Sequence, residues 1–509
     1  MSRWITLATI FFLLYASLFF LKQPHITTLD LGRHLVNGRE IMAHPAVLFT
    51  NYYSHTTPDF PAVNHHWLFG WLSWQLYTVG GFPLLVIANT SLAVAAIFLV
   101  FSIAKKSSST KVALIASIIC LPLLVNRTDI RPETISFFFM ALWIFLLQRL
   151  SQKSIVKILP LLAVTQIIWV NVHLFFVFGW LIAGTFLLRS ILVKKYRWQR
   201  LGLGLFFLVL PLISLINPSG IAGIVEPFII FNNYSYPIAE NQSLWFFLHY
   251  SPTNPYYWYA SLLVVITIFS SVFLVFKRKF SHLPFAMLSI VLALITWQIN
   301  RVGSFLGLAL IPLLAIVLRE VWQISGHRLK MFLQSSVGLM SASVVGFGMV
   351  IIIIWSQLFF PRFSVFGLTP PPNIRAAGQF LQSIETSGEI FNNYDIGSYL
   401  IFELFPYKRV FIDNRPEAYP TNFLKNDLIA AQESEDAWLE IVEKYSLGVI
   451  VFNYRDATDW AGPFIIRRVQ DPYWVPIYAD SEVVILVIDI PEHQEIIEKH
   501  RLPDDIFRF

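Results

Sequence analysis

Long apolar segments recur along the first 361 residues and are separated by short polar connectors. A helix needs about 20 apolar residues to cross a bilayer, and most of these segments approach or exceed that length. The pattern therefore predicts about eleven transmembrane helices. We place them at 5–21, 82–104, 112–126, 134–149, 158–172, 174–193, 201–217, 258–276, 284–299, 302–318 and 332–360.

Basic residues gather in alternate connectors, which the positive-inside rule assigns to the cytoplasm. These connectors lie at 105–111, 149–157, 189–200, 277–279 and 319–330. The remaining loops, including 22–81, 127–133 and 218–257, are then extracytoplasmic, as is everything after Pro361. The pattern predicts a multi-pass protein of the inner (plasma) membrane, with a cytoplasmic N-terminus and an uncleaved first helix.

The first outer loop contains an aromatic stretch at 65–79 that ends at Gly80 and Gly81. We interpret it as a helix that lies at the membrane interface, with its tryptophans at headgroup level. A further spanning helix here would invert every later loop and break the charge pattern.

Composition separates the chain into two parts. The whole chain is 56% hydrophobic and only 13% charged, which excludes an ordinary soluble protein. Residues 1–361 hold 24 Lys and Arg against 8 acids (+16), and residues 362–509 hold 13 against 23 (−10). We therefore predict a transmembrane domain at 1–361 and a soluble extracytoplasmic domain at 362–509. The basic part alone does not indicate nucleic acid, and a single cysteine excludes an intrachain disulfide.

The tail predicts a small α/β domain with a partly parallel sheet, because short β-rich runs alternate with helical ones. It follows three consecutive prolines, Pro370 to Pro372, that form a stiff linker. We expect helices at 375–383 and 436–445, strands at 389–394, 409–413 and 447–453, and a closing hairpin at 474–488.

Asp30 is the first of only eight carboxylates before Arg362, and it opens the first outer loop. His34 follows four residues later, on the same face if this segment is helical. With Arg33, these side chains can orient a hydroxyl, bind a divalent cation or bind a phosphate. A solvated loop with local ion pairs is an equally good interpretation of the spacing.

Further polar residues gather in other outer loops. Arg127 and Arg131 flank a short connector that also holds Glu133, and two arginines suit a phosphate clamp as well as an ordinary connector. Other single candidates in outer loops or at outer helix ends are His173, Glu240 and Arg301. In the tail, further candidates follow predicted strands, namely Tyr394, Asp395, Gly397, Asp413 and Arg415. Open sheets bind ligands at the ends of their strands, but ordinary turns also form there.

These segments together resemble the bacterial integral-membrane proteins of the GT-C glycosyltransferase superfamily. The resemblance runs through nearly the whole chain, in the order Asp30-Leu-Gly-Arg-His34, Asn37 to Ile41, Tyr53 to Thr56, His65 to Leu68, Arg131-Pro-Glu133, Asn171-Val-His173, Asn217-Pro218, Asn300-Arg301, Tyr394 to Leu400 and Ile412 to Arg415.

The resemblance implies a multispanning, inverting enzyme that transfers a sugar from a polyprenyl-phosphate donor to an extracytoplasmic lipid, glycan or protein. It implies that Asp30 is the general base, with His34 orienting it. Donor phosphate would be bound by Arg33, Arg131 and Arg301, in a pocket lined by Glu133, His173 and Glu240.

The chain also departs from the superfamily pattern. The usual acidic partner of Asp30 is missing, because Leu31 and Gly32 follow it, so a divalent cation (Mg²⁺ or Mn²⁺), held by Asp30 and His34 if present, stays an open expectation. The turn at Tyr394 to Gly397 is distantly similar to the acceptor-binding motif of oligosaccharyltransferases, but it lacks the tryptophan pair. The alternative function is non-enzymatic, namely translocation of envelope lipid or polysaccharide, or a scaffold for it.

Overall fold

A computed structural model describes residues 3–230, 236–324, 366–503 and 506. The chain forms two compact units, each built from three stretches of sequence. The first unit comprises Met1–Gln23, Leu85–Gly220 and Ile238–Leu368, and the second comprises Pro24–Leu84, Ile221–Pro237 and Thr369–Phe509.

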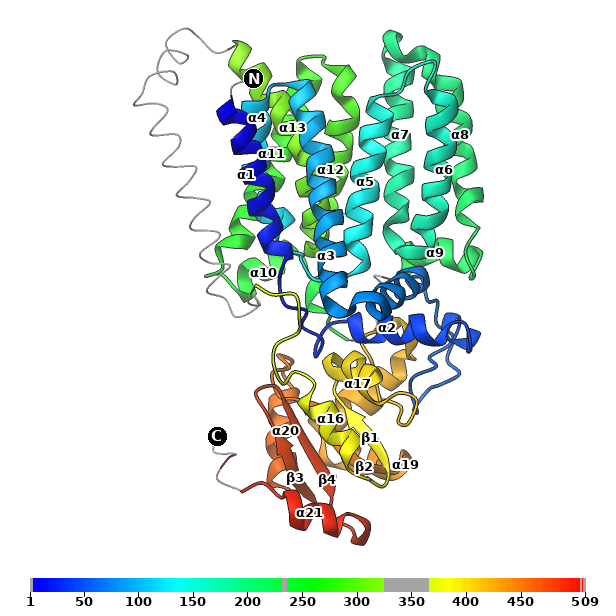
Figure 1. Cartoon of the computed structure of the whole chain (residues 1–509), viewed down its shortest axis with the longest axis vertical. Coiled ribbons are helices and arrows are strands. Elements are labelled where there is room, and N and C mark those ends of the chain that lie inside the picture. The colour runs from blue at the N-terminus through cyan, green and yellow to red at the C-terminus, as the bar shows by residue number, and fades with distance from the viewer. Residues whose placement is uncertain (1–2, 231–235, 325–365, 504–505, 507–509) are drawn as a thin grey trace. The chain divides into compact units, whose positions relative to one another are not determined.

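The first unit is a bundle of apolar helices that run side by side (Figure 1). Every predicted apolar segment up to residue 318 coincides with a helix, and the one at 332–360 lies outside the described residues. The helices are α1 (Arg3–Phe20), the part of α3 (Trp67–Ser107) from Leu85 onward, α4 (Thr110–Leu124), α5 (Pro132–Gln148), α6 (Ile155–Val172), α7 (Val177–Leu192), α8 (Arg200–Ser214), α10 (Leu244–Tyr250), α11 (Pro255–Phe276), α12 (Leu283–Gln298) and α13 (Gly303–Ile324).

Helix α13 is the central helix of this bundle. All its residues from Gly303 to Ile316 are buried, and it packs against α4, α11 and α12. In the described residues, six helical segments are long and apolar enough to cross a membrane, namely Trp67–Ser107, Ile155–Val172, Leu174–Leu192, Pro255–Phe276, Phe280–Gln298 and Asn300–Ile324. The chain is thus a multi-pass membrane protein, as predicted.

Helix α3 is interrupted at Gly80 and Gly81, whose backbone angles are not helical. Gly81 has a φ of 60°, a conformation that side chains with a Cβ rarely adopt, so glycine suits this position. The interfacial position of the part before the break stays a prediction.

The second unit contains a four-stranded sheet in the order β1-β2-β4-β3. Strand β1 (Glu389–Asn392) pairs parallel with β2 (Leu447–Asn453), and β2 pairs antiparallel with β4 (Val483–Ile488). Strand β3 (Trp474–Ala479) completes a hairpin with β4. Every residue of β2 is buried, as expected for a central strand that is covered on both faces. The predicted mixed α/β domain and its closing hairpin are confirmed.

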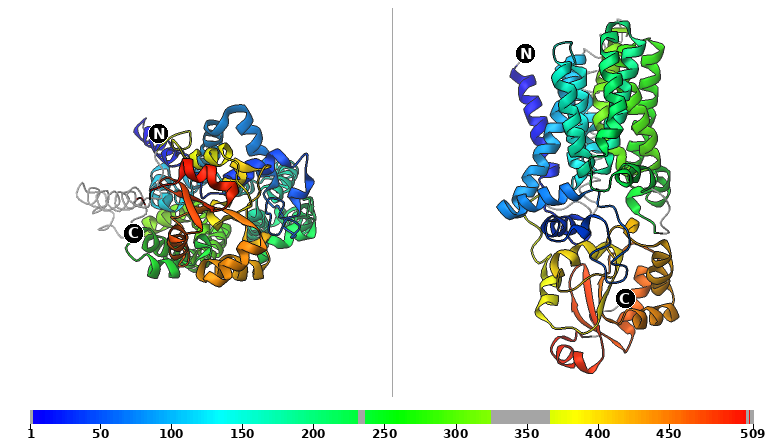
Figure 2. Two further views of the ribbon diagram at one scale, coloured as in Figure 1. Left: turned by 90° about the horizontal axis from the view of Figure 1, so that it is seen from below. Right: turned by 90° about the vertical axis from the view of Figure 1, so that its right-hand side faces the viewer.

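Helices surround this sheet, and Figure 2 shows them from two further sides. Phe391 of β1 packs against Trp438 and Phe464, which belong to two of these helices. The helices of the second unit are α2 (Leu31–Glu40), α9 (Ile221–Ile229), α16 (Ala376–Ser383), α17 (Gly397–Leu404), α18 (Ala430–Glu433), α19 (Glu435–Lys444), α20 (Ala461–Gln470) and α21 (Gln494–His500), with a π-helical stretch at Phe423–Ile429.

The strand predicted at 409–413 is wrong. Val410 forms only an isolated bridge with Ser54, and its backbone N–H donates to the Tyr53 carbonyl at 3.0 Å. The next N–H, that of Phe411, donates to Oδ1 of Asn392 at 2.9 Å. The backbone groups of this segment are therefore satisfied by a loop and a side chain instead of a neighbouring strand.

The segment around Tyr394 also differs from its predicted form. The strand expected at 389–394 ends at Asn392, and one 3₁₀ turn at Tyr394–Ile396 leads directly into α17. Helix α17 packs against α2 (Figure 1). At the contact, a Cβ added at Gly32 would lie 2.7 Å from the Ser398 carbonyl oxygen, so only glycine permits this approach.

Candidate functional site

Three arginines and two glutamates of the first unit form one ion-pair cluster. Arg127 donates through Nη2 to Glu133 at 2.9 Å and pairs with Glu240 through Nη1 at 2.9 Å. Arg301 donates to Glu133 at 2.6 Å, and Arg131 donates to Glu240 at 2.9 Å. The sequence candidates Arg131, Arg301, Glu133 and Glu240 thus meet, and Arg127 joins their two halves.

The cluster carries one positive charge in excess, because three guanidinium groups face two carboxylates. Glu133 is 3% exposed, so its charge is almost fully removed from water. Burial alone would raise the pKa of Glu240, but the guanidinium groups of Arg127, Arg131 and Arg301 outweigh it and hold that pKa well below its usual range. Glu240 therefore stays ionised and cannot act as a proton acceptor near neutral pH.

The position of the cluster follows from the local sequence. Arg127 and Arg131 lie in the connector between α4 and α5, and Pro132 and Glu133 occupy the first turn of α5, where proline and an acidic residue both suit a helix start. Arg301 lies in the short turn between α12 and α13, and its Nη1 also donates to Asn241 at 3.3 Å.

His173 lies in the same unit, fully buried after the end of α6. Its Nδ1 is 2.8 Å from the hydroxyl of Ser136, which also accepts a hydrogen bond from the Trp169 indole at 2.8 Å. Ser136 is one helical turn beyond Glu133 in α5, so His173 packs beside the cluster. Its contacts are those of a buried, hydrogen-bonded structural histidine.

Asp30 and Arg33 lie together in the second unit, at the start of α2. Asp30 is the N-cap residue, yet its side chain forms no capping hydrogen bond. Its carboxylate is 28% exposed and lies 3.8 Å from Nη2 of Arg33, whose side chain is only 4% exposed. Within the described residues, Nε of Arg33 has no hydrogen-bond partner. The pair thus combines an accessible carboxylate with a buried guanidinium that has donor capacity to spare.

His34 is buried in the same helix at 1% exposure. Its ring packs edge-on against His66 and Phe69, with centroids 5.3 and 5.0 Å away. The backbone N–H of His34 donates to the Asp30 carbonyl at 3.1 Å. The orienting role of this imidazole stays a prediction.

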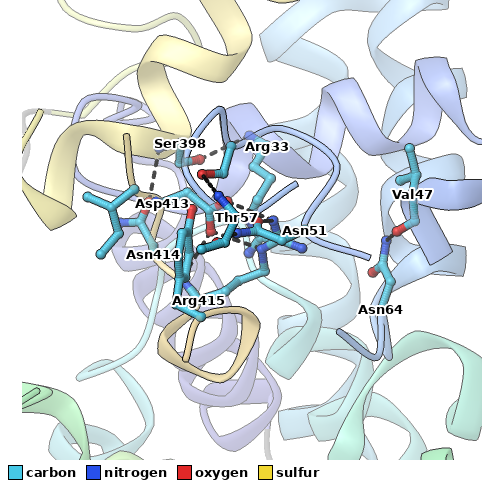
Figure 3. A network of polar contacts seen from close by, with 12 residues as sticks. Arg33, Val47, Asn51, Thr57, Asn64, Ser398, Asp413, Asn414 and Arg415 are labelled. Carbon is cyan, nitrogen blue, oxygen red and sulfur yellow. Dashed lines mark hydrogen bonds and ion pairs between the residues drawn. The ribbon is translucent and has the colours of Figure 1, made fainter. Parts of the chain in front are cut away.

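The tail candidates Asp413 and Arg415 form a buried bidentate ion pair (Figure 3). Arg415 donates through Nε and Nη2 to the two carboxylate oxygens at 2.9 and 2.7 Å, and also to Asn51 at 3.1 Å. Burial would raise the pKa of Asp413, but Arg415 outweighs it and keeps that pKa below its usual value. This pair therefore joins the tail to the segment that contains Asn51.

A second contact in the same network fixes α2. The backbone N–H of Arg33 donates to the Ser398 hydroxyl at 2.9 Å, and the Ser398 N–H donates to Asn414 at 3.0 Å (Figure 3). Gly397 permits this packing, since an added Cβ there would lie 2.1 Å from the Ile412 carbonyl oxygen. The tail motifs around Gly397 and Arg415 thus hold the helix that begins beside Asp30.

Tyr394 is buried in this unit, and its ring stacks on that of Tyr236 with centroids 4.3 Å apart. Burial raises the pKa of its hydroxyl well above the usual value, and the charges of Glu417 and Asp30 add to this effect. Tyr394 therefore stays protonated. Asp395, its neighbour, offers its backbone carbonyl to Asn414 at 3.1 Å.

Glu417 is a functional candidate that the sequence did not reveal. Burial raises its pKa to about 7, Arg415 and Arg33 lower it only in part, and Glu226 raises it further. Nothing local marks it, because it lies in an ordinary turn at Pro416–Ala418, two residues beyond Arg415. A carboxyl group that titrates near neutral pH can accept and release a proton under physiological conditions.

The residues around Asp30 do not form a three-ligand metal site. In the part of the chain that the structure describes, no three side chains of His, Cys, Asp or Glu come together as a cation site. The Arg33 guanidinium lies 3.8 Å from Oδ1 of Asp30, so it would compete with a cation for this carboxylate.

Several solved structures share this fold. An archaeal oligosaccharyltransferase, AglB from Archaeoglobus fulgidus in complex with an inhibitory peptide and a dolichol-phosphate, matches 96% of this chain and 75% of its own, with a TM-score of 0.63 and 11% identity. ArnT from Cupriavidus metallidurans bound to undecaprenyl phosphate matches 97% of this chain and 99% of its own, with a TM-score of 0.54 and 12% identity. No protein-family model and no curated protein matches the sequence.

The matches extend over nearly the whole length of the chain, so they include both the helical bundle and the tail. At 11 to 12% identity they define the fold alone. The chain therefore shares the fold of these two solved structures, and the GT-C-like fold predicted from its sequence is confirmed.

Proposed function

We propose that this protein is a membrane glycosyltransferase that takes a sugar from a polyprenyl-phosphate-linked donor and transfers it to an extracytoplasmic lipid, glycan or protein. The observation that carries this proposal is the fold. Over 96% and 97% of its length the chain is similar to one enzyme solved with a dolichol-phosphate and to another bound to undecaprenyl phosphate. A shared fold does not define a reaction, so the argument also depends on the charged groups.

The arginines supply the charge that a departing lipid phosphate requires. Arg127, Arg131 and Arg301 hold a net positive charge in the first unit, fixed by Glu133 and Glu240. Fixed guanidinium groups stabilise a developing phosphate charge without reorganisation, which lowers the barrier for its departure. In the second unit Arg33, with its unused Nε donor, is the corresponding candidate.

Asp30 is the proposed general base. An acceptor hydroxyl gives its proton to the carboxylate while its oxygen attacks the anomeric carbon of the donor sugar. The bond from that carbon to the lipid phosphate breaks, and the configuration is inverted. The Asp30 carboxylate suits this role because it is partly exposed and is not used as a helix cap. Glu417 is the second candidate for the proton acceptor, because its pKa of about 7 matches the working pH of a base.

The test uses the purified full chain in liposomes with undecaprenyl-phosphate- and dolichol-phosphate-linked radiolabelled sugars and measures consumption of the donor. We expect Asp30→Asn to reduce consumption by about a hundredfold or more, the usual contribution of a general base. Asp59→Asn is the matched control, because Asp59 is an exposed aspartate of the same loop.

Arg131→Gln tests the proposed phosphate-binding role of the ion-pair cluster separately. Its control is Arg319→Gln, at an exposed arginine. We expect weaker use of the donor in Arg131→Gln alone. Full activity in Asp30→Asn would remove Asp30 as the base and leave Glu417→Gln as the decisive variant. If neither the wild type nor any variant consumes the donor, the non-enzymatic alternative is favoured, namely a protein that translocates lipid or polysaccharide or acts as a scaffold.

A further inference from the structure

A cleft of about 420 Å³ opens at one end of the helical bundle, within the first unit. Two connectors form it, one between α5 and α6 and the other between α7 and α8. Its lining includes Ser151 and Lys153 from the first connector and Lys195, Tyr196, Trp198 and Gln199 from the second. None of these residues belongs to the arginine cluster or to the surroundings of Asp30.

Every charged residue in the sequence around this cleft is basic. Residues 149–200 contain eight lysines and arginines and no aspartate or glutamate. Lys153 and Lys195, one from each connector, are both exposed. Positive charges therefore lie on both sides of the opening, and neither connector supplies a carboxylate to balance them, which favours an anionic occupant.

A buried guanidinium lies directly behind the lining of the cleft. Arg189 is 1% exposed and donates to Gln148 at 2.9 Å and to Gln199 at 3.3 Å. Its charge also lies 4.0 Å from the centre of the Tyr196 ring. These partners are all neutral, so in the described residues the charge of Arg189 has no paired carboxylate. Since Gln199 and Tyr196 also line the cleft, an anion there would compensate this buried charge.

The surface beside the cleft is apolar. Val156, Leu192 and Leu201, which lie within five residues of the lining, are 72%, 56% and 74% exposed. Tyr196 and Trp198 have the amphipathic rings that are enriched at headgroup level. A headgroup in the cleft would therefore leave its acyl chains beside exposed aliphatic side chains, whereas a soluble phosphate compound would gain nothing from them.

We propose that this cleft binds the phosphate headgroup of an anionic phospholipid, with Lys153 and Lys195 flanking the phosphate and Arg189 as the buried counter-charge. Basic pockets between helices are known lipid-headgroup sites, and the charge bias predicts that this end of the bundle faces the cytoplasmic leaflet, where anionic lipids occur. The site is separate from the proposed transfer reaction and does not depend on it.

The test measures lipid retention by the delipidated full chain in mixed micelles of phosphatidylglycerol or phosphatidylcholine, using native mass spectrometry. We expect retention of phosphatidylglycerol alone. At about 1 kcal/mol per basic residue, or about fivefold, Lys153→Gln with Lys195→Gln should weaken it about 25-fold. Lys105→Gln with Lys106→Gln is the matched control, because these exposed lysines end α3 and do not line the cleft.

Three outcomes would overturn the proposal. Equal retention of the two lipids would show that charge does not select the occupant. An equal loss in the two double variants would show that only the general surface charge matters. Glycerol phosphate that displaces the lipid at equal concentration would show that the cleft takes a soluble phosphate compound instead.

Discussion

Glu417→Gln removes a carboxyl group that titrates near neutral pH in the folded protein. The pKa is about 7 in the fold against an ordinary value of 4.5. Between pH 4.5 and pH 7 the folded protein keeps a proton on Glu417 that the unfolded chain has released. The free energy of unfolding therefore falls as the pH rises through this range, and above pH 7 this contribution no longer changes. A pKa difference of about 2.5, at about 1.4 kcal/mol for each pH unit, gives an upper limit of about 3.5 kcal/mol for the loss of stability.

The assay compares the apparent melting temperature of wild type and Glu417→Gln in one detergent, at one scan rate, between pH 4.5 and 8. Wild type should lose stability across this range while Glu417→Gln keeps more of it, so the two curves separate towards pH 8. Glu443→Gln, at an exposed glutamate, should follow wild type. Difference infrared spectra near pH 6 should show a protonated carboxyl that Glu417→Gln lacks. Parallel melting curves would refute the reasoning.

Two further substitutions test the packing inside each unit by itself. Glu133→Gln removes the carboxylate that pairs with Arg127 and Arg301 and leaves three guanidinium groups facing Glu240 alone, so we expect a loss of about 3–5 kcal/mol, seen as a lower melting temperature, against no change in Glu443→Gln. Gly397→Ala should lower the yield of folded protein or its melting temperature, because the new Cβ would lie 2.1 Å from the Ile412 carbonyl oxygen. Gly462→Ala, a glycine with nothing within 4 Å, should be neutral or slightly stabilising.

Sequence periodicity predicted those features that depend on local pattern. Apolar length located the helices of the bundle apart from α10, and alternating short runs located β1, β2 and the closing hairpin. The strand expected at 409–413 failed because its backbone partners lie at Tyr53 and Asn392, which no local pattern can reveal.

The candidate site was predicted only in part. The charges of Arg131, Glu133, Glu240 and Arg301 were visible in the sequence, but their pairing joins residues as far as 168 positions apart. Glu417 was missed for a related reason. Its pKa depends on burial and on Glu226, and neither is encoded in the turn that contains it.

The close contact of Gly32 with Ser398 has an evolutionary consequence. Any side chain at position 32 would meet the backbone of α17, and the Ser398 hydroxyl accepts the N–H of the next residue, Arg33. The segments around Gly32 and Ser398, two residues that lie 366 positions apart, thus fit closely against one another and are joined by a hydrogen bond. Among related proteins they should change together, and a chimaera that takes its tail from a distant relative should need the matching α2 segment as well.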